Sequence, residues 1–300
     1  MSAAEPSWDL YEALLAVLRE GSLSGAARAL GVAQPTVRRQ IEALERALGA
    51  VLFTRASNGL VPTELALATL PHAEHIASAA RALARAVSGG ADADHGTVRV
   101  TASEVVGAEV LPPVLADLRR AHPRLQIELV ATNRTEDILR RDADVAVRMV
   151  EPAQAGLVRR RTGKVEVGLY AHERYLAEHP PPKGLDELGR GHFLVGADRS
   201  RALVDALASR GVALGPRDFA FRCDSDLVQL AAVRAGLGIG ACQVPLSRAP
   251  VRLVRVLPAV AFHLDVWVVM HEDLRASARV RLVFDALAEG LRAYGVARRR

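Results

Sequence analysis

The chain has 300 residues, half of them hydrophobic, which is enough for two or three compact units with cores of their own. Aromatic residues are only 4% of the chain, and its many alanines, leucines, valines and arginines favour helices and α/β units over an all-β sandwich. The formal net charge is +5, and Lys164 and Lys183 are the only lysines. Because arginine pairs with phosphates and guanine edges, this balance permits nucleic-acid binding without requiring it.

Several classes of protein are excluded at this stage. Cys223 and Cys242 are the only cysteines and are far apart in sequence, so neither a disulfide framework nor a cysteine zinc site is predicted. The N-terminus lacks the features of a signal peptide, and no apolar run reaches the roughly 18 uninterrupted residues of a membrane helix. We therefore expect a soluble cytoplasmic protein with no membrane partner, no cofactor and no metal.

The first thirty residues predict two helices separated by a turn. An apolar face begins at Trp8, and Gly21 is expected to end this first helix. A second, short helix is predicted over 25–30, with Ser22 or Ser24 as its N-cap.

A third helix and a hairpin follow. Pro35 suits the first turn of a helix, because its missing N–H is not needed there, and the helix is expected to run to about Leu48. Residues 51–62 contain Gly59 and Pro62 and predict a short hairpin.

The spacing of residues around the second turn is typical of a helix-turn-helix. Ala27 must be small where the two helices cross, Gly31 favours the positive φ of the turn, and Val37 anchors the second helix on the first. Amide, hydroxyl and guanidinium groups remain exposed on that helix and suit the reading of base edges and phosphates. A solvated helix face is the alternative. The exposed residues are Gln34, Thr36, Arg38, Arg39 and Gln40.

A long helix capped by Thr63 is predicted to extend to about Val87, with a kink or a restart at Pro71. A stripe of mostly small residues along it predicts a narrow coiled-coil seam between two copies of the chain. The alternative is a surface helix packed on its own domain. The stripe consists of Leu70, Ala73, Ala77, Ala80, Ala84 and Val87.

Beyond a glycine-rich linker, strands and helices alternate, which predicts a mainly parallel sheet. The first series has strands at 98–101, 127–131 and 145–147 and helices at 111–121 and 136–141. A second series begins at 165–170 and continues through 193–195, 202–209, 219–223 and 227–235, and segments 266–270 and 278–294 close the chain.

These N-terminal motifs support a family assignment. The stretches Gly21–Leu30, Gln34–Val37, Gln40–Glu45 and Leu48–Arg55 resemble the N-terminal signature of the LysR-type transcriptional regulators, and Leu230–Gly240 resembles a stretch of that family's effector domain. The resemblance implies an N-terminal all-α winged helix-turn-helix with a long linker helix, and a C-terminal α/β two-lobed effector domain similar to periplasmic binding proteins. The implied limits are 1–63 for the DNA-binding domain, 64–88 for the dimerising linker helix, 89–96 for a flexible linker and 97–300 for the effector domain, with lobe 1 at about 97–164 and 266–300 and lobe 2 at about 165–265.

The resemblance also implies a function. The chain would be a sequence-specific DNA-binding transcription regulator, not an enzyme, whose promoter binding is modulated by a small-molecule effector. Its partners would be double-stranded DNA carrying an interrupted palindrome near a promoter, the effector, and further copies of itself in a homodimer or homotetramer, with RNA polymerase as another candidate. The residues assigned to DNA binding are Ser24, Gln34, Pro35, Thr36, Arg38, Arg39, Gln40 and Arg55.

Three departures from the family pattern bear on DNA binding. Arg38 stands where the family usually has serine, which adds charge and reach. The wing usually carries more basic residues after the position of Arg55, whereas here Ser57 and Asn58 follow, so its grip on the DNA backbone is expected to be weaker. The usual glycine at the start of the linker helix is also missing, since Leu65 follows Glu64.

An effector site is expected at the carboxyl ends of the strands and near helix N-termini. Arg148 and the helix termini favour an anionic group there, whereas Glu104, Asp198 and Asp224 oppose it. A ligand with both an amine and a carboxylate would satisfy both. Ordinary helix capping is the alternative role for each of these residues, and Ser103, Asp198 and Asp224 could all serve as caps. The candidates are Ser103, Glu104, Thr132, Asn133, Arg148, Gly196, Ala197, Asp198, Asp224 and Ser225.

Two other functions are less consistent with the sequence. An enzyme with an appended DNA-binding domain would need a recognisable catalytic motif. Residues 236–240 carry three glycines but follow a helix and precede a strand, the reverse of a dinucleotide fingerprint. His72 and His75 lack the HExxH order. A binding protein without a DNA role is disfavoured by the helix-turn-helix spacing.

Overall fold

The structure is a computed structural model that describes residues 5–56, 59–88, 94–133, 143–152, 154–189, 191–248 and 250–295. The chain divides into two compact units, the first ending at Ala86 and the second beginning at Val87. The predicted helix at 136–141, residues 57–58 of the wing and most of the predicted linker lie outside the described residues.

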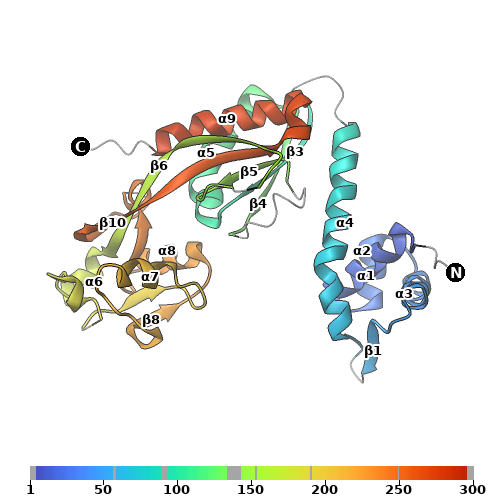
Figure 1. Ribbon diagram of the computed structural model, residues 1–300, viewed down its shortest axis with the longest axis horizontal. Helices are drawn as coiled ribbons and strands as arrows, with labels where there is room; N and C mark the ends of the chain where they lie inside the picture. The colour runs from blue at the N-terminus through green and yellow to red at the C-terminus, as the bar shows by residue number, and fades with distance from the viewer. Residues whose placement is uncertain are drawn as a thin grey trace. The chain divides into compact units, whose positions relative to one another are not determined.

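The first unit begins with three helices, α1 (Trp8–Glu20), α2 (Leu23–Leu30) and α3 (Gln34–Leu48) (Figure 1). A glycine at positive φ follows each helix: Gly21, Gly31 and Gly49. Residues with a side chain rarely adopt this conformation, so these glycines fix where each helix ends.

The cap of α2 is Ser22, whose Oγ accepts a hydrogen bond from the backbone N–H of Gly25 at 3.0 Å. The helix therefore begins at Leu23, two residues before the predicted start, and Ser24 lies within it. Gly25 is buried, and a Cβ at this position would lie 2.8 Å from Cβ of Glu20.

The three helices enclose the core of the first unit. Ala26, Ala27 and Val37 are buried where α2 and α3 meet, as the helix-turn-helix spacing requires. The buried members of this core are Ala13, Leu14, Val17, Ala26, Ala27, Val37, Ile41, Leu44, Leu52, Phe53 and Ala66.

A two-stranded antiparallel wing follows, formed by β1 (Phe53–Ala56) and β2 (Gly59–Pro62). Oε1 of Glu45, on α3, accepts hydrogen bonds from the backbone N–H groups of Leu52 at 2.6 Å and Phe53 at 3.1 Å. The hydroxyl of Thr63 donates to the carbonyl of Leu52 at 3.1 Å. Both ends of the wing are thus fixed, one of them directly to α3.

The long helix α4 (Glu64–Ser88) is capped by Thr63, whose Oγ1 accepts from the N–H of Ala66 at 3.2 Å. It continues through Pro71 as one helix, so the predicted restart does not occur. Leu70, Ala73 and Ala77 pack against Leu15 and Trp8 of α1. The prediction that these three residues form a seam between copies is therefore wrong, because α1 of the same chain covers them.

A different face of α4 is apolar and exposed. Leu65, Ile76 and Leu83 are 48%, 41% and 67% exposed. Spacings of eleven and seven residues bring all three within about 20° of one another around a helix. This exposed α4 stripe, defined by Leu65, Ile76 and Leu83, has the geometry of a coiled-coil seam.

The second unit is built on a six-stranded sheet in the order β4-β3-β5-β10-β6-β9. The strands β3, β4 and β5 are parallel to one another, whereas β10, β6 and β9 pair in antiparallel fashion. The expectation of a mainly parallel sheet thus holds for one half of it and is wrong for the other. The strands are β3 (Gly96–Ala102), β4 (Leu125–Ala131), β5 (Val145–Arg148), β6 (Leu157–His172), β9 (Gly240–Gln243) and β10 (Leu253–His271).

The antiparallel half arises because β6 and β10 are long strands that carry the chain between two lobes, as Figure 1 shows. The sequence predicts only the apolar parts of these strands, at 165–170 and 266–270, because charged residues interrupt the remaining parts. Lys164 pairs with Asp265, so the predicted lobe limits lie opposite each other on these strands.

The helices α5 (Leu111–Ala121) and α9 (Ala278–Gly295) pack together beside the sheet (Figure 1), and the one-turn π-helix η1 (Val106–Val110) leads directly into α5. Val283, Phe284 and Leu287 of α9 are buried there against β-strand residues such as Val100 and Val268.

The other lobe contains a smaller parallel sheet of β7 (Leu194–Gly196) and β8 (Phe219–Arg222), together with α6 (Glu173–Glu178), α7 (Ala202–Ala208) and α8 (Asp226–Arg234). It has a core of its own around Leu169, Leu194 and Leu207. Leu230 and Val233 of α8 belong instead to the core of the large sheet, so the two lobes are continuous at α8. None of the helices among the described residues has both the length and the apolar content that a membrane crossing needs.

Candidate functional site

The helix α3 has one buried face and one polar face. Val37, Ile41 and Leu44 are buried in the core of the first unit. Gln34, Pro35, Arg38 and Arg39 are exposed and Thr36 is half-buried. The N-terminal half of α3 therefore presents amide, hydroxyl and guanidinium groups to solvent, which are the groups that read the major groove.

The other predicted DNA-binding residues differ from these in their exposure and contacts. Ser24 is exposed on α2. Gln40 is half-buried, and its Nε2 donates to Oδ2 of Asp9 on α1 at 3.5 Å, so its amide is partly engaged within the protein. Arg55 is in β1, but its side chain lies outside what the structure describes.

A cavity of about 450 Å³ lies within the second unit, between the two lobes. Its lining is mostly apolar, with a few polar side chains, as is usual for small-molecule sites. The lining residues are Ser103, Val105, Thr132, Asn133, Arg148, Met149, Val150, Val167, Ala197, Ser200, Ala202, Leu203, Ala206, Asp226, Gln229, Leu230, Ala241, Cys242, Gln243, Leu246, Phe262 and Leu264.

Five of the ten predicted effector residues line this cavity: Ser103, Thr132, Asn133, Arg148 and Ala197. The strand register explains why three of them lie together. Ala102 of β3 pairs with Ala131 of β4 and with Val147 of β5. Thr132, Ser103 and Arg148 are the next residues on three adjacent strands, all at the carboxyl edge.

Arg148 is held firmly at this edge. It is 3% exposed, and its guanidinium donates to the carbonyl of Val147 at 3.0 Å and to Oγ1 of Thr101 at 3.1 Å. Ser103 is beside it, and its Oγ is buried without a hydrogen-bond partner among the described residues. A permanent cation and an unsatisfied hydroxyl are therefore adjacent at the cavity.

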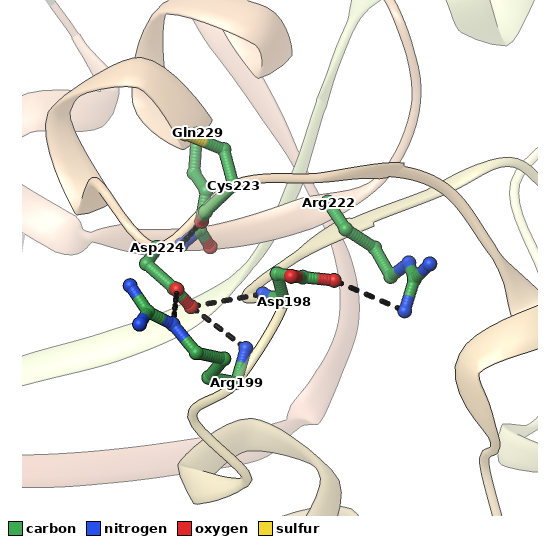
Figure 2. A network of polar contacts seen from close by, with 6 residues as sticks. All are labelled: Asp198, Arg199, Arg222, Cys223, Asp224 and Gln229. Carbon is green, nitrogen blue, oxygen red and sulfur yellow. Dashed lines mark hydrogen bonds and ion pairs between the residues drawn. The ribbon is translucent and has the colours of Figure 1, made fainter. Parts of the chain in front are cut away.

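Asp224 and Asp198 hold the chain near the cavity and do not line it (Figure 2). Oδ1 of Asp224 accepts from the backbone N–H of Asp198 at 3.1 Å and of Arg199 at 2.7 Å, and its Oδ2 accepts from Nε of Arg199 at 2.6 Å. Arg222 pairs with Asp198 at 3.1 Å. These hydrogen bonds from Arg199 lower the pKa of Asp224 to about 2. The network fixes the segment that leads from Ala197 into α7.

The remaining predicted residues also have structural contacts. Gly196 lies under the ring of Phe219, where a Cβ would lie 2.4 Å from Cε1. Ser225 caps α8 by accepting from the N–H of Val228 at 3.4 Å, and its hydroxyl also donates to Glu104. The capping role that was the alternative thus applies to Ser225.

Polar contacts tie α8 to the large-sheet lobe. Asn133 accepts from the N–H of Glu104 at 3.1 Å and donates to Oδ2 of Asp226 at 3.0 Å. Burial and the nearby charge of Glu104 raise the pKa of Asp226. At the other end of α8, both terminal nitrogens of Arg234 bond to the carboxylate of Glu109 at 2.9 Å.

Most of the cavity lining from the second lobe was not predicted from the sequence. These residues come from the sides of α7 and α8 and from β9 and β10, and not from the ends of strands. Leu203, Gln229, Gln243 and Phe262 are examples. Cys242 also lines the cavity, and burial raises the pKa of its thiol to about 12. Across the described ranges, no group of three or more His, Cys, Asp or Glu side chains is arranged to hold a metal ion.

Comparison with known proteins agrees with both parts of this geometry. A family model described as the LysR substrate binding domain matches residues 91–292, and one described as a bacterial regulatory helix-turn-helix protein of the lysR family matches residues 8–67. The chain belongs to the LysR family. It is a DNA-binding transcriptional regulator whose C-terminal domain binds a small-molecule effector.

Relatives match nearly the whole chain in sequence, and solved structures match it in fold. The chain is 26% identical to the HTH-type transcriptional activator TtdR of Escherichia coli K12, over 94% of each protein. In structure it resembles CbnR, with a TM-score of 0.68 at 18% identity over 95% of this chain and 99% of that one. It also resembles the Vibrio cholerae virulence activator AphB, with a TM-score of 0.62 at 21% identity over 94% and 99%.

Proposed function

We propose that this regulator reads a promoter site with the exposed face of α3, assembles through α4, and changes its DNA binding when the cavity of the second unit holds a ligand. Within this proposal, 1–63 is the DNA-binding domain, 64–88 the dimerising helix, 89–96 a linker and 97–300 the effector domain. The proposed compartment is the cytoplasm, and the protein is proposed to have no enzymatic activity of its own.

The main support for this proposal is the polar face of α3. Its exposed residues Gln34, Arg38 and Arg39 lie outside the buried apolar face, so the helix is rigidly held while its reading groups remain free to enter a groove. Arg39 and Thr36 are the proposed base contacts, and Arg38 adds a further positive charge beside them.

Assembly is proposed to follow from the exposed α4 stripe. Three large apolar side chains in line on a helix are unfavourable in water and are covered when a second copy packs on them. A two-fold dimer presents two reading helices, which matches an interrupted palindrome near a promoter. Tetramer formation and contact with RNA polymerase are further parts of the proposal.

Replacement of Arg39 or Thr36 by alanine tests the DNA-reading assignment. Each change should weaken binding to the selected operator by about 1–3 kcal/mol, while affinity for an unrelated duplex changes less. Fluorescence anisotropy of the full chain over a range of salt concentrations measures both. Arg292→Ala removes an exposed arginine of α9 and serves as the charge control. Unchanged operator affinity in both α3 variants would refute the assignment.

A further inference from the structure

We propose that the ligand of the cavity is an organic monocarboxylate with a bulky apolar body. This inference rests on the proposed function, in which the cavity of the second unit is the effector site. It goes further because it assigns a charge, a polarity and a size to the ligand. The cavity supplies three independent observations for it: the donors at one edge, the apolar lining beyond them, and the charges placed around the rest.

The carboxylate is assigned to the edge where Ser103 and Thr132 follow β3 and β4 and Arg148 ends the adjacent strand β5. Arg148 supplies a permanent positive charge, and a guanidinium pairs more favourably with a carboxylate than with a neutral group. The buried Oγ of Ser103 has no partner among the described residues. An unsatisfied buried hydroxyl is costly, and a ligand oxygen beside it would satisfy it.

The apolar body is assigned to the opposite part of the lining. Leu203 and Ala206 of α7, Leu230 of α8, and Phe262 and Leu264 of β10 contribute carbon surface there. The volume of about 450 Å³ is roughly three times that of the ~150 Å³ cavity known to hold one benzene. A fused pair of rings or a branched chain of similar size therefore fits, whereas a small hydroxy acid would leave most of the apolar surface in contact with water.

The charges around the cavity favour one carboxylate over two. Among the described lining residues, Arg148 is the only cation and Asp226 the only acid. Glu104 lies close to Asp226 and reinforces the negative character of that side. A second ligand carboxylate would thus find no cation among these described residues and would meet these acids.

A ligand ammonium is disfavoured as well. The carboxyl group of Asp226 already accepts from Asn133 at 3.0 Å and from Nε2 of Gln229 at 3.4 Å. The amide groups of Asn133 and Gln229 therefore already bind both carboxylate oxygens of Asp226, which a ligand cation would need.

Four matched probes test this assignment: 2-naphthoate, naphthalene-2-carboxamide, naphthalene-2,6-dicarboxylate and 2-naphthylmethylammonium. Their affinities for the full-length protein are measured by isothermal titration calorimetry. We expect 2-naphthoate to bind at least roughly tenfold more tightly than each of the others, because a hydrogen bond to a charged group is worth that much more than a neutral one. Equal or tighter binding of any other probe, or no binding of any probe, would overturn the proposal.

Two arginine variants identify the group that sets this preference. Arg148→Gln should bring the affinity of 2-naphthoate down to that of the amide, and Arg148→Lys should restore part of the difference. Arg161→Gln is the matched control, because Arg161 pairs with Asp265 at 2.6 Å and does not line the cavity. An unchanged preference in a folded Arg148→Gln variant would contradict the assignment. If that variant does not fold, the ranking of the probes in the Lys variant and the unaltered protein decides.

Operator binding, measured on the same samples, separates the two levels of the argument. Loss of the predicted ranking while the protein still binds its operator specifically would refute only the ligand class. Failure of the unaltered protein to discriminate its operator from an unrelated duplex would refute the proposed function itself.

Discussion

Glu45 shows how a single carboxylate positions a DNA-binding element. Its Oε1 accepts hydrogen bonds from two consecutive backbone N–H groups at the start of the wing. A side chain of α3 thus satisfies two backbone donors where the wing begins. The position of the wing relative to the reading helix therefore depends on this contact.

Replacing Glu45 by alanine should destabilise the first unit by about 1–3 kcal/mol, because two part-buried donors lose a charged acceptor. Urea unfolding of the full chain, followed by a probe in the first unit, measures the change. Glu42→Ala is the matched control, since Glu42 is exposed on the same helix. Equal urea midpoints of unfolding for the two variants would show that the hydrogen bonds to Glu45 contribute nothing to stability.

Asp224 provides a prediction that depends on pH. Arg199 lowers its pKa from the ordinary value of 3.8 to about 2. For a carboxyl group with a depressed pKa, the stabilisation is present above the unfolded value and is lost as the pH falls through the folded value. The difference in thermal midpoint between the unaltered chain and Asp224→Asn should thus be constant from neutral pH to about pH 5, and should shrink between about pH 4 and pH 2. If the difference in thermal midpoint stayed constant between about pH 4 and pH 2, the lowered pKa of Asp224 would be contradicted.

At the scale of elements, the sequence shows where helices end, but it does not show which surface covers each apolar face. Gly21, Gly31 and Gly49 could be identified because positive φ has a local cause. The stripe containing Ala73 and Ala77 was assigned to a second copy, yet it packs on α1. Periodicity shows that a face is apolar, but it does not distinguish cover by the same chain from cover by another.

The exposed α4 stripe now gives a sharper test of assembly. Ile76→Glu should convert dimers to monomers, because a charge in the seam would be buried without a partner. Leu67→Glu is the matched control: Leu67 is also an exposed leucine, and nine residues place it about 180° around the helix from Ile76. Sedimentation velocity measures both. Stable dimers of Ile76→Glu, or monomers of both variants, would place the seam elsewhere.

The effector site could be predicted in part for a similar reason. Ser103 and Thr132 follow directly after strands and Arg148 ends one, positions that βαβ order reveals from sequence. Gln229 and Leu203 lie on the sides of helices, and Phe262 lies within a long strand whose extent was underestimated. Which side of these elements faces a cavity depends on tertiary packing, and no local pattern in the sequence encodes it.

At the scale of the whole molecule, the two lobes of the second unit are less independent than a freely hinged pair. Leu230 and Val233 of α8 share the core of the large sheet, and Arg234 and Glu109 tie the same helix to η1. We infer that ligand binding acts on a largely preformed cavity. Any effect on DNA must then pass through the assembly of the chains and requires that the ligand favour one arrangement over another.

One thermodynamic cycle tests the central claim that this cavity and the reading helix are coupled. A probe that binds the cavity is titrated into the full-length protein by calorimetry, alone and with saturating operator DNA, and operator affinity is measured with and without that probe. We predict that the two affinities change by the same factor, because coupling between two sites is reciprocal. Identical ligand affinity with and without operator, together with unchanged operator affinity at saturating ligand, would contradict it.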